Sequence, residues 1–177
     1  MQIQVATTSE FTTVQEVALD RLHQAVFPPA ARAAEAEERY SWADPQWAVL
    51  LWHEDELITH VGIVVRDVDS NGVNKRIGGI GGVMTHPAHQ GKGFAGRVMQ
   101  RAAQYLEEEL AVPFALLFCR PELTAFYGRL GWRPFTGTLF VEQPEGRIEF
   151  SVHGPKVRDV CEVAPTTGEL DLCGLPW

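Results

Sequence analysis

One stretch of the sequence decides the fold: Val83-Met84-Thr85-His86-Pro87-Ala88-His89-Gln90-Gly91-Lys92-Gly93-Phe94-Ala95. A strand ends near its start, a glycine-bearing loop follows, and a long helix begins near its end. Gly91 and Gly93 let the main chain approach a ligand closely. The first N–H groups of a helix have no intrahelical partner and lie at the positive end of its dipole. The stretch therefore predicts an anion site, which we interpret as a cradle for a pyrophosphate.

The loop sequence by itself allows other interpretations. Gly91 to Gly96 matches GxGxxG, a dinucleotide-binding fingerprint, but several strands and helices precede it where that fold would begin. A Walker loop requires Ser or Thr directly after Gly-Lys, whereas Gly93 and Phe94 follow Lys92. An ordinary connection between a strand and a helix would bind nothing.

Strand patterns precede the loop. Four glycines fall within residues 78–82, and glycine weakens a strand unless another group approaches it closely. We therefore expect something to pack tightly against this strand. The strands expected here are Trp47–Trp52, Leu57–Arg66 and Arg76–Thr85, with a turn at Asn71-Gly72.

The first forty residues predict one strand and two helices. The strand is Gln2–Ala6, and Ser9 is the expected cap of the first helix. Ala30–Arg39, rich in Ala and Glu, predicts the second helix. The apolar stripe of the first helix is Val14, Val17, Ala18, Leu22 and Val26.

The remainder of the chain continues the alternation of helices and strands. A helix runs to about Leu110 with Ala95, Met99, Ala103, Leu106 and Leu110 on one stripe. The later elements are a strand Phe114–Cys119, a helix from Pro121 to Leu130, and closing strands Trp132–Phe135, Thr138–Val141 and Arg147–Val152. We expect one α/β domain over residues 1–153, with an extended tail, residues 154–177, packing on it.

Composition excludes several classes of protein. The chain has 177 residues, of which 45% are hydrophobic and 21% charged, the balance of a globular domain. The longest apolar run, residues 111–119, is interrupted by Pro113 and is too short to span a bilayer. The N-terminus does not resemble a signal peptide. Three widely spaced cysteines predict neither a disulfide framework nor a zinc site, so we expect a cytoplasmic protein without a metal.

The net charge of −8 argues against binding to nucleic acid, which needs a basic surface. Residues 1–89 carry 6 basic and 12 acidic side chains, whereas residues 90–177 carry 9 and 11. An acidic N-terminal half suits a cationic substrate, although a solvated acidic surface would look the same.

The order of these elements, with two motifs, resembles the GNAT superfamily of acyl-CoA-dependent N-acyltransferases. Gln90, Gly93 and Ala95 meet its Gln/Arg-x-x-Gly-x-Gly/Ala signature, and residues 123–132 resemble its helix ending in Tyr-x-x-x-Gly-aromatic. The resemblance covers about residues 47–135. Within the superfamily the chain is most similar to aminoglycoside 2′-N-acetyltransferases, on residues 51–53, 58–64, 127–132 and Trp177.

This resemblance implies a mixed, mostly antiparallel sheet with a central splayed pair of parallel strands, flanked by helices. Acetyl-CoA would lie where the strands Arg76–Thr85 and Phe114–Cys119 diverge. A bulge near Val83 would leave main-chain groups of Val83 and Thr85 free for the pantetheine arm and the thioester carbonyl. The coenzyme-binding residues are expected to be Val83, Met84, Thr85, Gln90, Gly91, Lys92, Gly93, Phe94 and Ala95.

The implied reaction is acyl transfer to a primary amine of a small cationic acceptor, an aminoglycoside among the candidates. Tyr127 is the expected general acid for the departing thiolate, and its alternative role is to fill the interface between helix and sheet. No base is assigned, because Gly81 stands where the family has an acidic strand residue. The candidates are Glu35, Glu37, Glu38, Asp44, His60, His86 and the carboxylate of Trp177.

Further expectations concern single residues. His86 and His89 are spaced HxxH but have too few companions for a metal site. Lys92 either contacts phosphate or is solvated. Cys119 is expected as an apolar filler. Trp42, Trp47 and Trp52 could line an acceptor pocket or belong to the core. A homodimer is expected by analogy, and neither a membrane nor a nucleic acid is expected as partner.

Two other functions stay open. A sensor or interaction module could keep the coenzyme cradle without catalysis, as the missing strand carboxylate suggests. More remotely, the GxGxxG match allows a nucleotide-phosphate domain.

Overall fold

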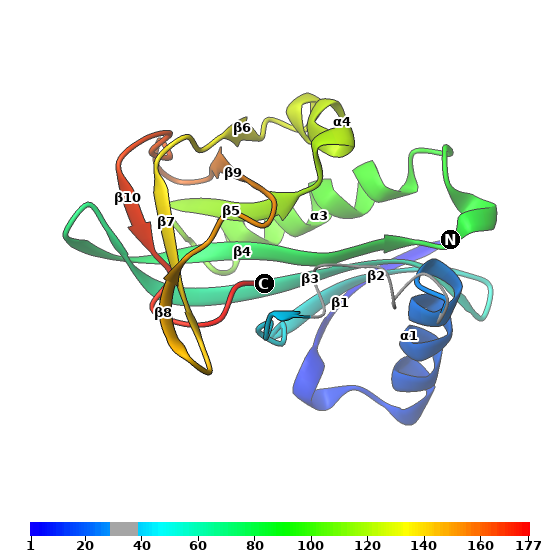
Figure 1. Ribbon diagram of the computed structural model, residues 1–177. Helices are drawn as coiled ribbons and strands as arrows, with labels where there is room; N and C mark the ends of the chain where they lie inside the picture. Colours follow the sequence, from blue (N-terminus) through cyan, green and yellow to red (C-terminus); the bar gives the residue numbers. More distant parts are fainter. Residues whose placement is uncertain (29–38) are drawn as a thin grey trace.

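Ten strands form one mixed sheet in the computed structural model, which describes residues 1–28 and 39–177 (Figure 1). Its centre consists of β2 (Trp47–His53), β3 (Glu56–Ser70) and β4 (Val73–Thr85), each antiparallel to the next. β1 (Gln2–Thr7) pairs with β2, and β5 (Phe114–Cys119) lies parallel to β4. These strands and the mixed α/β class confirm the expectation from the sequence.

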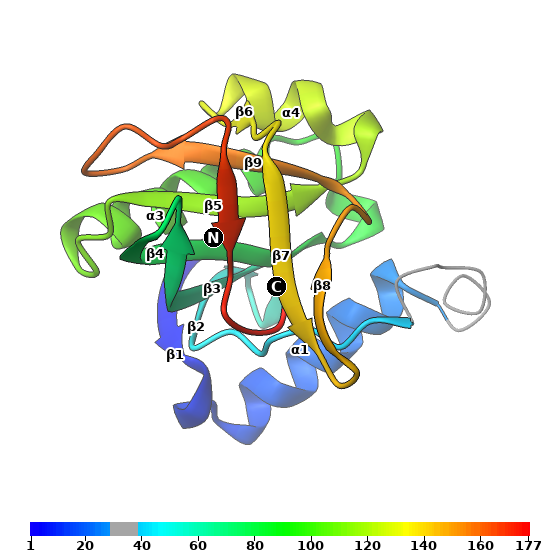
Figure 2. The same cartoon turned by 60° about the vertical axis from the view of Figure 1, so that its left-hand side comes forward.

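Short strands extend the sheet at both ends. The order is β6-β9-β5-β4-β3-β10-β7-β8, and β10 also pairs parallel to β7. In Figure 2, β7 and β8 cross in front of the central strands, because the sheet curls over its own face. The bounds are β6 (Arg133–Pro134), β7 (Thr138–Gln143), β8 (Gly146–Glu149), β9 (Gly154–Asp159) and β10 (Glu169–Asp171).

Residues 154–177, predicted as an extended tail that packs on the domain, supply β9 and β10 to the sheet. β9 pairs along all six residues of β5, with Val157 fully buried. β10 joins β3 to β7, and Leu170 and Leu172 are fully buried there. Three prolines suggested an irregular chain, but Pro155 lies within β9 and the others lie outside the strands.

Helices cover both faces of the sheet. α3 (Phe94–Glu108) and α4 (Thr124–Arg129) lie on one face, and α1 (Thr13–Val26) lies on the other (Figure 1). α3 buries Met99, Ala103 and Leu106 as predicted. The expected Ala95 and Leu110 are only half-buried, and the helix instead also buries Phe94, Val98 and Ala102.

α1 differs from its prediction in two respects. Its N-cap is Thr12, which forms a capping box with Gln15, so the predicted cap Ser9 is wrong. Ser9 lies in a preceding 3₁₀ turn, Thr8–Glu10. Only Leu22 of the predicted stripe is fully buried, and Val14 and Val17 are exposed. The second predicted helix, Ala30–Arg39, falls almost entirely outside the described residues.

The glycines of β4 are matched by large neighbours, as the sequence predicted. A Cβ on Gly78 would meet the end of the Leu106 side chain, and a Cβ on Gly79 would collide with the indole ring of Trp177. At Gly81 it would lie 2.8 Å from the main-chain carbonyl carbon of Trp177. The glycines therefore make room for α3 on one face and for Trp177 on the other.

The architecture excludes one interpretation of the glycine loop. A dinucleotide-binding domain would have a parallel, doubly wound sheet, whereas the central strands here are antiparallel, so that interpretation of the loop is wrong.

None of the helices in residues 1–28 and 39–177 combines the length and the apolar character that crossing a membrane requires.

Candidate active site

The parallel strands β4 and β5 separate partway along their length. They pair at three positions, from Gly78–Ala115 to Ile80–Leu117. Beyond these pairs β4 continues to Thr85 and β5 continues to Cys119 without further pairing between them. The two strands therefore diverge in the way that the resemblance implied, and main-chain groups along the divergence are available to a ligand.

A β-bulge lies on β4 at this divergence. His60 pairs with Met84 and Gly62 with Gly81, so Val61 of β3 faces two residues of β4, Gly82 and Val83. Gly82 has a φ of 55°, the left-handed conformation that favours glycine at a bulge. The bulge removes Val83 from the ladder between β3 and β4, as predicted.

His60 holds the bulge from β3. Its Nδ1 lies 2.7 Å from the carbonyl oxygen of Gly82, so this nitrogen carries the proton and donates it. Nε2 is then a bare acceptor, and it is buried without a hydrogen-bond partner among the described residues. Burial lowers the pKa of His60, which keeps the ring neutral. An unsatisfied buried acceptor costs about 1–3 kcal/mol. From the sequence alone, His60 is only one of several candidate bases.

The glycine loop leads into α3 with its first N–H groups open. Gly93 is the N-cap with a φ of 79°, and no side chain caps the helix. Gly91 also has a positive φ, of 74°, and a Cβ on either glycine would meet nothing within 4 Å. A helix N-terminus with positive potential and free N–H groups fits a pyrophosphate.

Among the predicted coenzyme-binding residues, some side chains are buried and others are hydrogen-bonded within the loop. Phe94 and Met84 are buried in the core, so only their main chain can reach a ligand. The Lys92 ammonium donates to the carbonyl of Ala88, within its own loop. Gln90 donates from its side chain to the carbonyl of Thr85.

The contact between Gln90 and Thr85 corrects the expectation that the main-chain groups of Thr85 are free. The carbonyl of Thr85 is not free, because Gln90 occupies it, and Thr85 pairs with Thr59 in the ladder. Val83 is thus the better of the two predicted positions for contact with a thioester. Gln90 acquires a structural role, since it ties the loop to the end of β4.

Tyr127 lies in α4, on the same face of the sheet as α3. It is 4% exposed and belongs to the apolar cluster that includes Phe94, Cys119 and the flanking Val83. Burial, with a smaller contribution from Cys119, raises the pKa of Tyr127 well above its usual value. The phenol therefore keeps its proton at neutral pH, as a general acid must. Cys119 is buried with a raised pKa, which agrees with the predicted filler role and opposes that of nucleophile.

The opposite face of the divergence is covered by Trp177. Its indole N–H donates to the carbonyl of Leu116 on β5, and the guanidinium of Arg66 lies 5.4 Å from the ring centroid. Arg66 also donates to the carbonyl of Leu175. The residues that precede Trp177 are thus fixed across β3, β4 and β5.

A cavity of about 340 Å³ opens beside this covered face. Phe135, Leu139 and Phe150 form apolar walls, and Glu149 is the carboxylate in its lining. Phe150 contacts Phe118 of β5, which in turn contacts Trp177. The cavity is therefore linked to β5 and Trp177 through the rings of Phe150 and Phe118. The sequence analysis did not single out Glu149, because it belongs to no motif.

The other residues singled out from the sequence are placed as follows. Trp42 packs edge-on against Phe150, beside the cavity, and is the tryptophan that borders a possible acceptor site. Trp47 packs on Tyr105 and Trp52 packs on the cluster under α1, so both belong to the core. Glu35, Glu37 and Glu38 lie outside the described residues.

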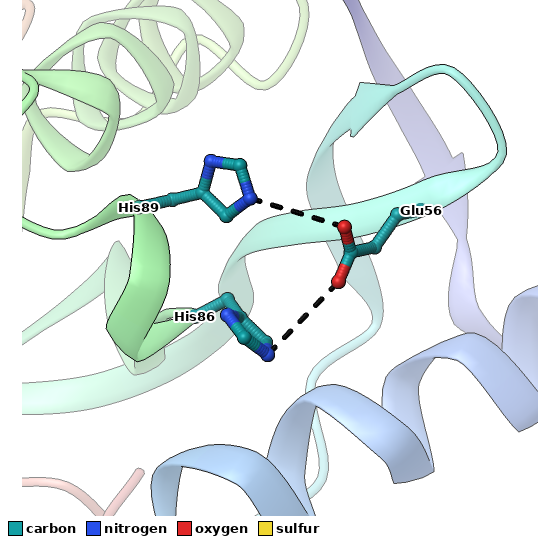
Figure 3. A group of neighbouring side chains, drawn as sticks. All are labelled: Glu56, His86 and His89. Atoms are coloured by element: carbon teal, nitrogen blue, oxygen red, sulfur yellow. Dashed lines mark ion pairs between the residues drawn. The ribbon is translucent and has the colours of Figure 1, made fainter.

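Glu56, His86 and His89 converge at the loop before α3 (Figure 3). Both histidines turn Nε2 toward the carboxylate, at 3.9 Å for His86 and 3.8 Å for His89. The N–H of Ala88, however, donates to Nδ1 of His86. Neutral His86 consequently carries its proton on Nε2, the atom that faces Glu56. A metal ligand needs the reverse arrangement, so this cluster is better suited to hydrogen bonds than to zinc.

Comparison with protein families agrees with this geometry. Residues 7–135 match the family model described as an acetyltransferase (GNAT) domain, and they include the bulge, the glycine loop and Tyr127. The chain belongs to the GNAT family. A search of curated proteins found no match to the sequence.

Solved structures, two of them described as GNAT acetyltransferases, share the fold. Escherichia coli ElaA has 20% sequence identity and a TM-score of 0.64, covering 89% of this chain and 99% of that chain. The GNAT N-acetyltransferase YhbS from Escherichia coli, solved with CoA, has 16% identity and a TM-score of 0.63, covering 97% and 89%. A GNAT acetyltransferase from Brucella melitensis, solved with acetyl-CoA, has 15% identity and a TM-score of 0.55, covering 92% and 94%. These likenesses concern the fold, and they do not identify an aminoglycoside branch.

Proposed function

We propose that this GNAT protein transfers an acetyl group from acetyl-CoA to an amine. One observation carries the proposal: the divergence of β4 and β5, with a bulge at Gly82 and Val83, opens beside an uncapped helix N-terminus. Such a site combines main-chain donors for a carbonyl with an anion site for a pyrophosphate. The GNAT structures with acetyl-CoA and CoA support the same co-substrate here.

The main chain holds the coenzyme in this proposal. The loop from Gln90 to Ala95 would bind the pyrophosphate, and β4 from Val83 to Thr85 would face the pantetheine arm. The Val83 N–H would donate to the thioester carbonyl oxygen, where negative charge develops as an amine attacks. A thioester supplies an activated acyl carbon, so the chain's own residues need only position it and manage protons.

Tyr127 is the proposed general acid. The acceptor first loses one ammonium proton to solvent, because only the neutral amine has a lone pair. The amine nitrogen then forms a bond to the acyl carbon, the C–S bond breaks, and the thiolate takes the phenolic proton. The proton that the amine loses passes to solvent, from which the phenol regains its own. The place of Tyr127 in one cluster with Val83 and Cys119 supports this role, and the burial that raises its pKa excludes a role as base at neutral pH.

The acceptor is proposed to be a small amine that carries a cation on an apolar body. The cavity of about 340 Å³ supports this, because its lining includes the carboxylate of Glu149 and the apolar side chains of Phe135, Leu139 and Phe150. An aminoglycoside, with several ammonium groups, would need more carboxylates. Within the described residues that line this cavity there is one, so an amine with a single charge fits better.

The proposal is tested by free-thiol release from acetyl-CoA. The acceptors are an arylalkylamine, a polyamine, a peptide N-terminus and an aminoglycoside, each at several concentrations. We expect release above the rate of hydrolysis with the arylalkylamine first. Release with the aminoglycoside alone would restore the finer assignment, and no release with any amine would contradict acetyl transfer.

A coenzyme-binding module without catalysis is the second candidate function. The observation in its favour is that β4 carries glycines at 78, 79, 81 and 82 and no carboxylate there. Titration calorimetry separates the two functions, since binding of acetyl-CoA without thiol release from any acceptor would favour the module.

A further inference from the structure

His60 is the polar group closest to the bulge from the side of β3. Its ring stacks on Gly82 so closely that a Cβ there would lie 3.3 Å from Cε1. Its strand partners are Leu50 on β2 and Met84 on β4, both buried and apolar. An apolar side chain would fill this place without leaving a buried nitrogen unpaired. The hydrogen bond to Gly82 is therefore the feature that distinguishes histidine here.

The hydrogen bond from His60 orients the whole peptide between Gly82 and Val83, including its N–H. A trans peptide is planar, with its C=O and N–H pointing in opposite directions, and no cis peptide bond occurs among the described residues. The carbonyl of Gly82 and the N–H of Val83 belong to the same peptide. The carbonyl is held toward the ring of His60, which comes from β3, so the Val83 N–H of the same planar peptide points away from that ring. β5, which diverges from β4, lies on the side of β4 opposite β3.

We infer that His60 is a positioning residue that aims the Val83 N–H at the thioester carbonyl. The inference rests on the proposed function and adds a residue that acts through one rigid peptide. Without the bond from Nδ1, Gly82 could rotate its peptide, because glycine allows many φ and ψ values. The Val83 donor would then lose its direction while the rest of the coenzyme site stayed in place.

The inference is tested with two variants of His60. His60→Asn keeps an N–H donor near the position of Nδ1 and removes the unpaired Nε2, whereas His60→Leu removes the donor. We expect His60→Leu to lower kcat about 10- to 100-fold, the loss typical of a misaligned or missing donor. The KM for acetyl-CoA should change little, since the pyrophosphate loop is untouched. His60→Asn should recover most of kcat.

A control and a spectroscopic measurement complete the test. Ile77→Val, in the buried part of β4 away from the bulge, should lower stability without changing kcat. NMR of the ¹⁵N-labelled ring should show His60 protonated on Nδ1 and bare on Nε2 at pH 7. The opposite tautomer, or equal kcat for wild type and a folded His60→Leu, would overturn the inference. If His60→Leu does not fold, the opposite tautomer would still overturn the inference.

Failure of the proposed function gives a different result. If no amine releases thiol in the wild type, the acetyl-transfer proposal fails, and the amide resonance of Val83 still reports on His60. That resonance should shift on addition of acetyl-CoA in the wild type and in His60→Asn, but not in His60→Leu. An equal shift in all three proteins would contradict the role of His60.

Discussion

At the scale of single residues, two buried side chains flank the divergence of β4 and β5, and burial affects them in opposite ways. Tyr127 is held protonated on the α3 face, and His60 is held neutral on the other face. Both shifts arise because an apolar environment disfavours the charged form. At neutral pH the centre of the sheet thus contains a proton donor and a fixed dipole, with no buried charge on either ring.

Replacement of Tyr127 by Phe should remove the proposed general acid and keep the packing of its ring. We expect kcat to fall by about 100-fold or more, as for the loss of a general acid. The affinity for acetyl-CoA, measured by calorimetry, should not change. Tyr105→Phe is the matched control, because Tyr105 packs on Trp47 away from the divergence, and its kcat should equal that of the wild type.

The neutral state of His60 predicts a dependence of stability on pH. In the unfolded chain His60 has an ordinary pKa near 6.5, and burial lowers its pKa in the fold, where His23 on α1 opposes a charge as well. Below pH 6.5 His60 binds a proton in the unfolded state but not in the folded state, so the free energy of unfolding falls as the pH falls.

Urea unfolding at pH 5, 6, 7 and 8 measures this effect. The wild type should lose more stability between pH 7 and pH 5 than His60→Asn does, because the variant retains every other histidine. Equal losses in the two proteins would show that His60 is protonated in the fold.

At the scale of elements, the sequence predicted the strand, loop and helix of residues 76–110 because local signals agree there. Glycines, apolar periodicity and helix ends all lie within a few residues of one another. The bulge was predicted from the family resemblance, but its support by His60 was not. His60 and Gly82 are 22 residues apart, and only the register between β3 and β4 brings them together.

Gly93→Ala tests the loop as an anion site. The left-handed φ of Gly93 strains any other residue, so the first turn of α3 should shift and the Kd for acetyl-CoA should rise about tenfold. Gly72→Ala is the matched control, since Gly72 has the same φ of 79° and open space around it, but lies in the turn between β3 and β4. Both variants should lose similar stability, and only Gly93→Ala should weaken binding of the coenzyme.

At the scale of the whole molecule, β10 is the connection between two parts of the sheet. It pairs with β3 on one side and with β7 on the other, so the strands β7 and β8 depend on it. This pairing could not be predicted from the sequence, because the strand of residues 169–171 is short and pairs with residues about a hundred positions earlier. The hydrophobic pattern of a sequence predicts that a strand exists. It is less able to predict which distant strand that strand pairs with.

Leu170→Ala should therefore weaken the molecule as a whole. Leu170 is fully buried, and the loss of its side chain should cost about 2–5 kcal/mol of unfolding free energy in urea. The amides of β7 and β8 should exchange with solvent faster than those of β2 and β3. Leu123→Ala, at an exposed position, should change the unfolding free energy by less than about 0.5 kcal/mol.

The contact between Trp177 and Gly79 limits how this chain can vary. A side chain at position 79 and an indole at position 177 cannot occupy the same space, so a larger residue at position 79 is tolerated only if position 177 changes with it. Homologues with a bulkier residue at position 79 are therefore expected to have a smaller residue, or a displaced chain, opposite it. Because Trp177 contacts Phe118, and Phe118 contacts Phe150 in the wall of the cavity proposed to take the amine, such paired exchanges would also change the shape of that wall.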